Sequence, residues 1–390
     1  MSREALTNAV LLLAWLPVAY YIFAADSARR FFRRSAREQS ANDAHNRADF
    51  TPAVSILKPV RGLDRHSLEH FTSFCRQDYP AYEILFAVAD ASDPAIPVIR
   101  QLADAHAERS IRLIVGASEI GASSKVNKLC GLAREARHEI LVISDSDISV
   151  PPSYLRSVVA PFEDAQVGAV TCLYRGAPDR GLWATLEALG ISTDFVPGVI
   201  VARRLEGVKF ALGATMATTR ARLTEVGGFE ALAEYCADDF EFGRRIAERG
   251  YRIELATCTV ATESSPRTFA QFFRHQMRWA ITLRHSRPWG YVGRAVVTQG
   301  LPWALAAAVL APSVWLAAAP LAIYLTSRLW MAWTVGARGL GDETVRRRWM
   351  LIPVYDVLAT VISIVALCVN RIEWRGRRFK MRNGRLVPIG

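Results

Sequence analysis

Two pairs of carboxylates stand where they could hold a cation or accept a proton. Asp145 and Asp147 directly follow the apolar run at 139–143. Two carboxylates two residues apart at the end of a strand can both reach one hard cation, and Mg²⁺ or Mn²⁺ takes oxygen ligands while leaving positions open for phosphate oxygens. A turn with a capping aspartate is the structural alternative. The position after a buried strand favours a divalent metal site at Asp145 and Asp147.

The second pair, Asp238 and Asp239, precedes an amphipathic stretch at 240–249. A carboxylate at the N-terminus of a helix is favoured electrostatically, so helix capping would explain the pair without any chemistry. The functional alternative is a general base, which takes a proton from a hydroxyl while the oxygen of that hydroxyl attacks.

A cationic and aromatic cluster lies on the amphipathic stretch 269–283, just before a long apolar block. It contains His275, Arg278 and Trp279. An interfacial helix with aromatic and cationic anchors would explain the cluster. An Arg-Trp pair beside a metal site could also clamp a diphosphate and stack on an acceptor, and the two explanations are compatible.

Three further polar residues stand where a predicted strand ends or a predicted helix begins. Asp90 ends the apolar run that begins at residue 82, where a carboxylate could accept a proton from a nucleotide base or ribose. Lys125 and Asn127 follow Gly121 in a loop that opens a helix, which is a natural place to meet a phosphate or a ribose. Each of the three, taken alone, is more typical of a solvated surface residue.

The elements that must position these residues are short apolar runs alternating with helix-like stretches. The runs read AVSILKPV, YEILFAVAD, IRLIVG and EILVISDSD, and the stretches between them are 68–76, 96–108 and 125–136. This alternation predicts a parallel sheet with crossover helices. Ligands bind beyond the carboxyl ends of the strands in such sheets. No GxGxxG follows the first run, and GASEIGASSK lacks the Gly-Lys-Ser/Thr of a P-loop.

The composition indicates a membrane protein. The chain has 390 residues, 51% of them hydrophobic, and a net charge of +11. These values exclude a disordered or fibrous protein. Residues 5–25 carry no charge and can span about 30 Å of hydrocarbon, and five arginines follow between residues 29 and 37. A retained anchor is favoured over a signal peptide, and the positive-inside rule puts the chain after residue 28 in the cytoplasm.

The C-terminal part is also apolar. Residues 295–327 are uncharged and predict a two-helix hairpin within 295–337, and 350–370 predict another span with Asp356 as its only charge. Three spans after a cytoplasmic domain would put the basic tail outside. Either the last segment is re-entrant or interfacial, or the tail departs from the positive-inside rule. The tail holds seven basic residues: Arg371, Arg375, Arg377, Arg378, Lys380, Arg382 and Arg385.

The order of eight motifs resembles the ceramide glucosyltransferases of family 21, which are relatives of the family 2 glycosyltransferases. The motifs cover residues 53–285 and read LKPVRGLD, QDYPAYEI, VADASDPAI, GASSKVNKL, ISDSDISVPP, LGATMATTR, GGFEALAEYCADDF and HQMRW. The sequence is also similar to the bacterial branch that glycosylates hopanoid lipids. The resemblance implies an α/β GT-A catalytic domain, which is Rossmann-like, with N-terminal and C-terminal transmembrane helices. It also implies inversion at the anomeric centre.

The resemblance also implies roles for the site residues. Asp90 would contact the nucleotide, Asp145 and Asp147 the diphosphate and a divalent metal, Mg²⁺ or Mn²⁺, and Asp239 would be the catalytic base. The animal enzymes tend to lack the second carboxylate that Asp147 supplies, which favours metal dependence here.

The family's Q/R-x-x-R-W motif falls on His275, Arg278 and Trp279. The motif departs at its first position, because a neutral imidazole supplies no fixed positive charge. The expected catalytic set is therefore Asp239, Arg278 and Trp279. The residues expected to bind the nucleotide sugar are Lys58, Pro59, Asp90, Lys125, Asn127, Asp145, Asp238 and His275.

The predicted activity is transfer of glucose or N-acetylglucosamine from a UDP-sugar to a hydroxyl of a membrane lipid, either a ceramide-like sphingolipid or a hopanoid. The protein would be a multi-pass integral membrane protein with its catalytic domain facing the cytoplasm. The expected divisions are an anchor at 1–28, a basic juxtamembrane linker at 29–50, a GT-A catalytic domain at 51–264, amphipathic interfacial helices at 265–294, membrane helices at 295–370 and a basic tail at 371–390. The apolar segment 183–202 would either line an acceptor groove or form a buried helix.

Three alternative functions remain open. A processive polysaccharide synthase would need more spans and would make a polymer. A glycosyltransferase acting on a polyprenyl phosphate has an acceptor that is already an anion, so it needs no base. A membrane-anchored binding or transport protein would show no dependence on a divalent metal. Nucleic acid is not an expected partner, because the basic clusters stand beside apolar runs and are not interleaved with aromatic residues.

Overall fold

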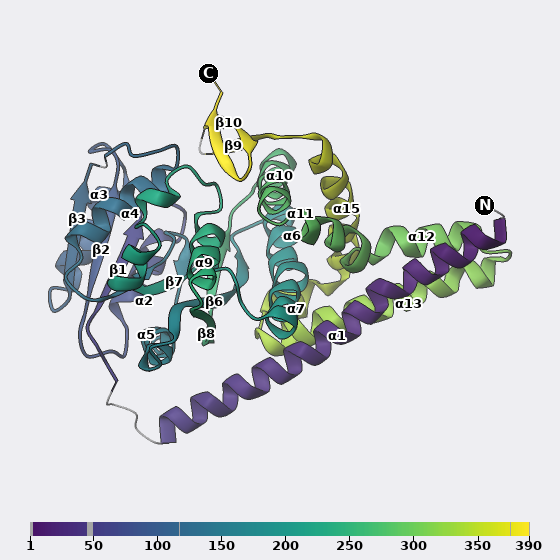
Figure 1. The fold of residues 1–390 in the computed structure, drawn as a ribbon, viewed down its shortest axis with the longest axis horizontal. Helices are drawn as coiled ribbons and strands as arrows, with labels where there is room; N and C mark the ends of the chain where they lie inside the picture. Colours follow the sequence, from purple (N-terminus) through teal and green to yellow (C-terminus); the bar gives the residue numbers. More distant parts are fainter. Residues whose placement is uncertain (1–2, 45–49, 117, 375, 390) are drawn as a thin grey trace.

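The computed structural model describes residues 3–44, 50–116, 118–374 and 376–389. A sheet domain lies at one end and a group of long helices at the other (Figure 1). The main sheet has eight strands in the order β3-β2-β1-β4-β7-β6-β8-β5. The strands are β1 (Val54–Pro59), β2 (Tyr82–Val88), β3 (Ser110–Val115), β4 (Ile140–Ile143), β5 (Ile148–Ser149), β6 (Val167–Pro178), β7 (Met216–Thr219) and β8 (Arg252–Ser264).

The four strands β3, β2, β1 and β4 are parallel, whereas β7 runs antiparallel to both β4 and β6. Every residue of β1, β2 and β4 is buried, as expected for strands covered on both faces. The expected crossover helices are α2 (Ser67–Cys75), α3 (Ala95–Ala105) and α4 (Ser124–Glu135). The predicted α/β class with a parallel-rich sheet is therefore confirmed.

The two faces of the sheet pack into two different cores. Because side chains alternate along a strand, Ile56 joins a core with Phe71 and Phe86, whereas Leu57 joins a core with Leu129 on the opposite face. The second core continues without a break into Ala25 and its neighbours in the N-terminal helix. The sheet domain and the long helices are thus packed as one body.

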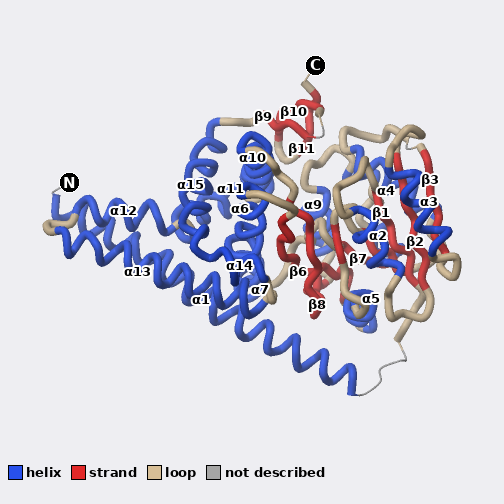
Figure 2. Tube along the Cα trace, turned by 180° about the vertical axis from the view of Figure 1, so that it is seen from behind, coloured by secondary structure: helices blue, strands red, loops and turns tan. Residues whose placement is uncertain are grey.

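The N-terminal helix α1 (Arg3–Ala44) is about 63 Å long at 1.5 Å per residue. It runs beside α12 (Gly300–Leu310) and α13 (Val314–Ala332), which form the predicted hairpin (Figures 1 and 2). The segment expected to be a basic linker is helical as far as Ala44, and residues 45–49 lie outside the described residues.

Four helical segments in the described part of the chain are long and apolar enough to cross a membrane: Thr7–Glu38, Leu182–Glu206, Val314–Gly339 and Glu343–Cys368. The second of these comprises α6 (Leu182–Gly190), the π-helix η2 (Ile191–Phe195) and α7 (Val196–Glu206). Its apolar window is 78% buried inside the protein. The segment 183–202 is therefore a buried helix, the second of the two alternatives that its composition allowed.

The remaining helices connect these parts. They are α5 (Tyr154–Val159), α8 (Arg220–Glu225), α9 (Asp238–Glu248), α10 (Phe269–Ser286), α11 (Pro288–Gly293), α14 (Glu343–Arg348) and α15 (Ile352–Cys368). Two further π-helical segments, η4 (Arg294–Thr298) and η5 (Trp333–Gly339), and three short 3₁₀ helices complete the described helical structure. The 3₁₀ helices are η1 (Ala160–Glu163), η3 (Glu230–Leu232) and η6 (Trp349–Leu351).

The basic tail forms a second, three-stranded antiparallel sheet of β9 (Arg371–Trp374), β10 (Arg377–Arg382) and β11 (Arg385–Pro388), and Arg375 lies outside the described residues. This sheet is hydrogen-bonded to the loop before α9. The Leu386 N–H donates to the Glu234 carbonyl at 2.7 Å, and the Cys236 N–H donates to the Gly384 carbonyl at 3.2 Å. Because a bilayer cannot separate bonded parts, the tail lies on the same side of any membrane as the sheet domain.

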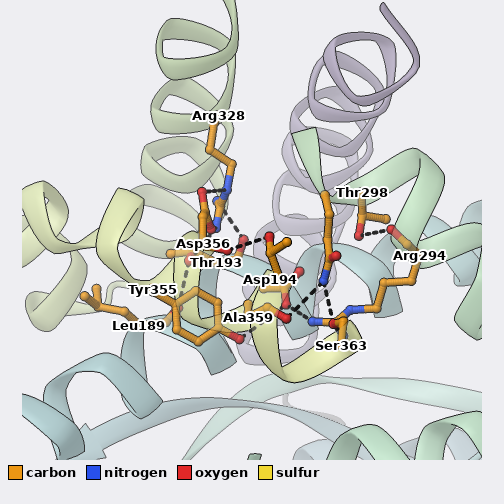
Figure 3. A network of polar contacts seen from close by, with 12 residues as sticks. Leu189, Thr193, Asp194, Arg294, Thr298, Arg328, Tyr355, Asp356, Ala359 and Ser363 are labelled. Carbon is orange, nitrogen blue, oxygen red and sulfur yellow. Dashed lines mark hydrogen bonds and ion pairs between the residues drawn. The ribbon is translucent and has the colours of Figure 1, made fainter. Parts of the chain in front are cut away.

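Two ion pairs are buried among the long helices (Figure 3). In α13, Arg328 pairs with Asp356 of α15 at 2.9 and 3.0 Å and donates to the Thr193 carbonyl in η2 at 3.0 Å. Asp194, the next residue of η2, pairs with Arg294. Charges in such surroundings are costly unless they are paired. The two pairs therefore fix how the segment 182–206 sits against α13, α15 and η4.

Removing one partner of the buried pair of Arg328 and Asp356 should lower the free energy of unfolding more than removing both. We expect Arg328→Met to cost about 3–5 kcal/mol, because it leaves the Asp356 carboxylate buried and uncompensated. Arg328→Met with Asp356→Leu should regain much of that loss. Thermal unfolding of the purified protein in detergent measures the effect. Arg30→Met, in a pair whose arginine side chain is 71% exposed, is the control and should change the melting temperature little. A double variant no more stable than Arg328→Met would contradict this account.

Candidate functional site

Loops from three elements bring the predicted carboxylates around one lysine at the carboxyl edge of the sheet. Asp145 comes from the turn after β4, and Asp238 and Asp239 open α9. Lys125, in the first turn of α4, places its Nζ 2.9 Å from Asp145 Oδ1 and 3.2 Å from Asp238 Oδ2. These two ion pairs unite both predicted carboxylate pairs in a single site, which the sequence pattern did not require.

Gly213, in the loop before β7, leaves the space between these groups open. A Cβ at this position would lie 3.2 Å from Asp239 Oδ2, 3.4 Å from Asp145 Oδ2 and 3.7 Å from Lys125 Nζ. Any side chain here would fill the gap between the carboxylates. Sequence reasoning missed Gly213, although it stands in the motif LGATMATTR.

Asp147 lies farther along the same turn. Its Oδ2 accepts a hydrogen bond from Thr262 Oγ1 at 3.1 Å, and its carbonyl accepts one from the Glu263 N–H at 3.0 Å. Burial and the nearby Asp145 and Asp64 carboxylates raise the pKa of Asp147 to about 6. Within the residues that the structure describes, no three His, Cys, Asp or Glu side chains are already arranged as a metal site.

Asp239 has the properties of a proton acceptor. Burial and the neighbouring Asp238 carboxylate raise the pKa of Asp239 to about 6, although Lys125 opposes this shift. Burial also raises the pKa of Asp238. Ala237 is the N-cap residue of α9, but both aspartates lie in the first turn, where the helix dipole favours a carboxylate, and Asp239 Oδ1 accepts a hydrogen bond from the Phe240 N–H at 2.8 Å. Stabilisation of the helix N-terminus and a role in proton transfer are therefore compatible. A carboxylate with this pKa is ionised at neutral pH and more basic than usual.

Lys58 and Asn127 form hydrogen bonds to backbone groups that border the site. Lys58 is fully buried at the end of β1, which Pro59 closes, and its Nζ donates to the Asp145 carbonyl at 2.7 Å. Burial lowers the pKa of Lys58 to about 7. Asn127 accepts from the Gly121 N–H at 3.0 Å and donates to the Gly121 carbonyl at 2.9 Å. Both side chains thus hold backbone beside the acidic cluster, which consists of Asp145, Asp147, Asp238 and Asp239.

Asp90 stands apart from the acidic cluster. It follows β2, which is separated from β4 by β1 in the sheet. Its carboxylate is exposed, and Oδ1 accepts hydrogen bonds from the Ser92 N–H at 2.8 Å and Ser92 Oγ at 2.9 Å, which lower its pKa. Strand spacing of about 4.8 Å puts it roughly 10 Å along the edge from the end of β4, a separation that suits the far end of a nucleotide.

The predicted cluster on α10 faces partners that the sequence did not identify. The Arg278 guanidinium lies 5.7 Å from the ring centroid of Trp374 in β9. His275 Nδ1 lies 3.4 Å from Oε2 of Glu187, a buried carboxylate in α6. Trp279 is partly exposed.

A contact between Cys236 Sγ and Thr282 Oγ1 at 3.3 Å fixes α10 against the loop that leads into Asp238. The second sheet is bonded to the same loop at Glu234 and Cys236. The loop, α10 and the C-terminal sheet therefore form one assembly beside the acidic cluster.

Comparison with known proteins gives one family. The model for glycosyl transferase family 21 matches residues 9–387. Ceramide glucosyltransferase 1 of Caenorhabditis elegans is 29% identical over 234 residues, which are 60% of this chain and 50% of that protein. A ceramide glucosyltransferase of Komagataella phaffii is 32% identical over 101 residues, which are 25% of this chain and 20% of that protein. The chain spans half or less of the length of these two relatives.

Among solved structures, the mannosyltransferase PcManGT from Pyrobaculum calidifontis, in complex with GDP-Man and Mn²⁺, is 20% identical to this chain. The match covers 90% of this chain and 99% of that one, with a TM-score of 0.49.

The charge of Lys125 should set the acidity of its neighbours. We expect Lys125→Met to raise the pKa of Asp239 above 6, because the ammonium that favours the ionised carboxylate is removed. Carboxyl ¹³C chemical shifts followed over pH in selectively labelled protein measure this shift. Lys209→Met removes an exposed lysine and is the matched control. An unchanged Asp239 titration in Lys125→Met would refute the electrostatic coupling.

Proposed function

Since the chain belongs to glycosyl transferase family 21, we propose that it transfers glucose or N-acetylglucosamine from a UDP-sugar to a hydroxyl of a membrane lipid, with inversion at the anomeric carbon. The acceptor would be a ceramide-like sphingolipid or a hopanoid. The curated relatives that are named ceramide glucosyltransferases support a lipid acceptor. One observation carries the proposal: Asp239, with its raised pKa, faces Asp145 across the open space at Gly213.

The acidic cluster fits a divalent cation. Asp145, Asp147, Asp238 and Asp239 outnumber the two amino groups of Lys125 and Lys58, and carboxylate oxygens are the ligands that Mg²⁺ and Mn²⁺ prefer. Asp145 and Asp147 would hold the ion, and Gly213 leaves room beside them. Such an ion, when bound, would neutralise part of the charge that develops on the departing diphosphate.

Asp239 would perform the proton transfer. Its carboxylate takes the proton of the lipid hydroxyl while that oxygen forms a bond to the anomeric carbon. The bond between the anomeric carbon and the diphosphate oxygen breaks on the opposite face, and UDP leaves with the electron pair. Asp238 and Lys125 hold the local charge balance through their ion pair.

The other predicted residues would surround the donor. Asp90 would contact the base or ribose, while Lys58 and Asn127 keep the backbone of the site in place through their hydrogen bonds. Arg278 would approach the diphosphate from α10. His275 is half-buried beside the buried Glu187 carboxylate, so the nucleotide sugar would meet only the imidazole of this pair.

The proposed membrane arrangement gives the lipid access from α10. Residues 1–28 and 295–370 would lie in the bilayer and residues 51–264 would face the cytoplasm, with residues 265–294 at the interface. Large apolar side chains exposed on α15 support this arrangement, because soluble proteins rarely expose such a continuous set. They are Val354, Val357, Val361, Ile364 and Leu367.

Replacing the proposed base should abolish transfer without abolishing donor binding. We expect Asp239→Asn to lower kcat about 10²–10⁴-fold, which is the usual contribution of a general base, and to leave the Kd of UDP nearly unchanged. The assay offers labelled UDP-glucose or UDP-N-acetylglucosamine with ceramide or a polyhydroxylated hopanoid, with Mg²⁺ or Mn²⁺ or a chelator. Label in the organic phase reports transfer.

The control for this experiment is Asp78→Asn, which neutralises an aspartate whose side chain is 74% exposed. Transfer that survives Asp239→Asn would favour the polyprenyl-phosphate alternative, because that acceptor needs no base. Label in a polymer would favour the processive synthase. Equal transfer of label with chelator and with Mg²⁺ or Mn²⁺ would show that the reaction needs no divalent metal.

The enzyme should lose activity as the pH falls below about 6. Asp239 must be ionised to accept a proton, and its pKa is raised to about 6. We therefore expect kcat/KM to be level above pH 7 and to fall about tenfold per pH unit below pH 6. Steady-state rates at saturating Mn²⁺ measure this limb, and donor Kd over the same range separates it from protonation of Asp147. Constant kcat/KM down to pH 5 would show an ordinary carboxyl at the base position.

A further inference from the structure

A cavity of about 250 Å³ lies beside Asp147 and has no part in the proposed proton transfer. Its walls come from four places: the loop after β1, the residue after β6, the end of β8 with the loop that follows, and the first turn of α10. Its polar side chains include those of Asp64, Arg65, Asp179, Glu263, Arg267 and Gln271. These residues were not singled out by the sequence motifs, apart from Asp64 within LKPVRGLD.

Glu263 is buried in the wall of this cavity, and its carboxylate lies near the ring and the backbone N–H of His66. The residue is only 9% exposed, and neither Oε1 nor Oε2 has a hydrogen-bond partner. The nearest cationic candidate is His70, whose Nε2 lies 3.6 Å from Oε2. Burial lowers the pKa of His70 to about 4, so the imidazole is neutral at pH 7 and does not balance the carboxylate.

The unsatisfied groups gather at this one place. Seven buried side-chain atoms lack a hydrogen-bond partner among the described residues, and four of them belong to Glu263, the adjacent Ser264 and His70. Buried polar atoms in proteins almost always have partners. Glu263 lines the cavity, whereas Ser264 and His70 lie outside its lining, so the two carboxylate oxygens of Glu263 are the atoms that indicate a ligand with hydrogen-bond donors.

The charges around the cavity select the chemical class of that ligand. Asp64, Asp179 and Glu263 disfavour an anion. Arg65 and Arg267 lie 3.2 and 4.0 Å from the Asp179 carboxylate and disfavour a simple cation. The described residues also hold no three-ligand metal cluster. A hydroxyl can donate a hydrogen bond to a carboxylate and accept one from a guanidinium at the same time. A polyhydroxylated group can therefore pair with both the carboxylates and the arginines of the cavity.

We propose that this cavity binds a neutral polyhydroxylated group, with Glu263 accepting hydrogen bonds from its hydroxyls. The volume is below the range of about 300–1,000 Å³ for drug-sized ligands and suits a single ring. Asp147, which would hold the metal and diphosphate, is bonded on both sides to this wall: its carbonyl accepts from the Glu263 N–H and its Oδ2 from Thr262 Oγ1. The proposal rests on the proposed function, and the ring is either the donor hexose or the polyol head of the acceptor.

The test compares Glu263→Gln with Glu69→Gln, a matched control in which the side chain is 79% exposed. Titration calorimetry with Mn²⁺ gives the Kd of UDP and of the UDP-hexose that supports transfer, and initial rates give the acceptor KM. We expect Glu263→Gln to leave the Kd of UDP within twofold and to raise either the Kd of the UDP-hexose or the acceptor KM at least about tenfold. Glu69→Gln should match the wild type in every measurement.

The two sources of the ring give different results. A raised Kd of the UDP-hexose with an unchanged acceptor KM identifies the ring as the donor hexose. A raised acceptor KM with an unchanged Kd of the UDP-hexose identifies it as the acceptor head group. Constants equal to those of the wild type in all measurements would overturn the proposal and leave a cavity that holds only water. A tenfold loss of UDP affinity itself would also overturn it, because Glu263 would then support the diphosphate site.

A second variant protects the test against misfolding. Asp64 is exposed at the rim of the cavity, so Asp64→Asn should fold and shift the same constant in the same direction as Glu263→Gln. If Glu263→Gln unfolds, the constants of Asp64→Asn decide the proposal alone. A wild-type protein that binds no UDP-sugar and transfers none would refute the proposed function itself. Normal wild-type transfer with unaffected variants would refute only the cavity assignment.

Discussion

The crowding of like charges at the carboxyl edge of the sheet is the constraint on which the rest of the structure depends. Asp145, Asp238 and Asp239 lie close enough to interact, and Asp238 and Asp239 are largely withdrawn from water, so the mutual repulsion of the three carboxylates must be balanced. Lys125 supplies part of that balance through two ion pairs. The remaining negative charge raises carboxyl pKa values and provides affinity for a cation. The same imbalance thus serves both the proposed base and the proposed metal.

Elements distant in the chain hold this arrangement in place. The loop that leads into Asp238 is hydrogen-bonded to β11, next to the C-terminus, and touches α10 through Cys236. The basic tail is therefore part of the site's framework, and these hydrogen bonds keep it on the same side of any membrane as the sheet domain. Sequence counting left that side open, because hydropathy identifies apolar segments without showing which of them is enclosed by protein.

The apolar helices differ in how much of their surface is covered by the rest of the protein. The segment 182–206 is as apolar as a membrane span, yet most of it is covered by other elements and it carries Asp194 toward Arg294. The covering elements include β6, α1, α10, α13, α14 and α15. The pair of Arg328 and Asp356 fixes the same segment from the other side. Paired charges in a low-dielectric setting are tolerated and give a defined register between helices that apolar packing alone specifies poorly.

The sequence by itself determined the parallel α/β class, the crossover helices to within a few residues, the two carboxylate pairs and the apolar segments at both ends. These features depend on local periodicity and on residues adjacent in the chain, so they can be predicted without knowledge of the tertiary structure. Tertiary structure alone decided that both pairs meet at Lys125 and Gly213, and that Arg278 faces Trp374. It also decided that Glu263 lines a cavity beside Asp147. Such contacts join residues far apart in the chain, and only the packing of whole elements brings them within bonding distance.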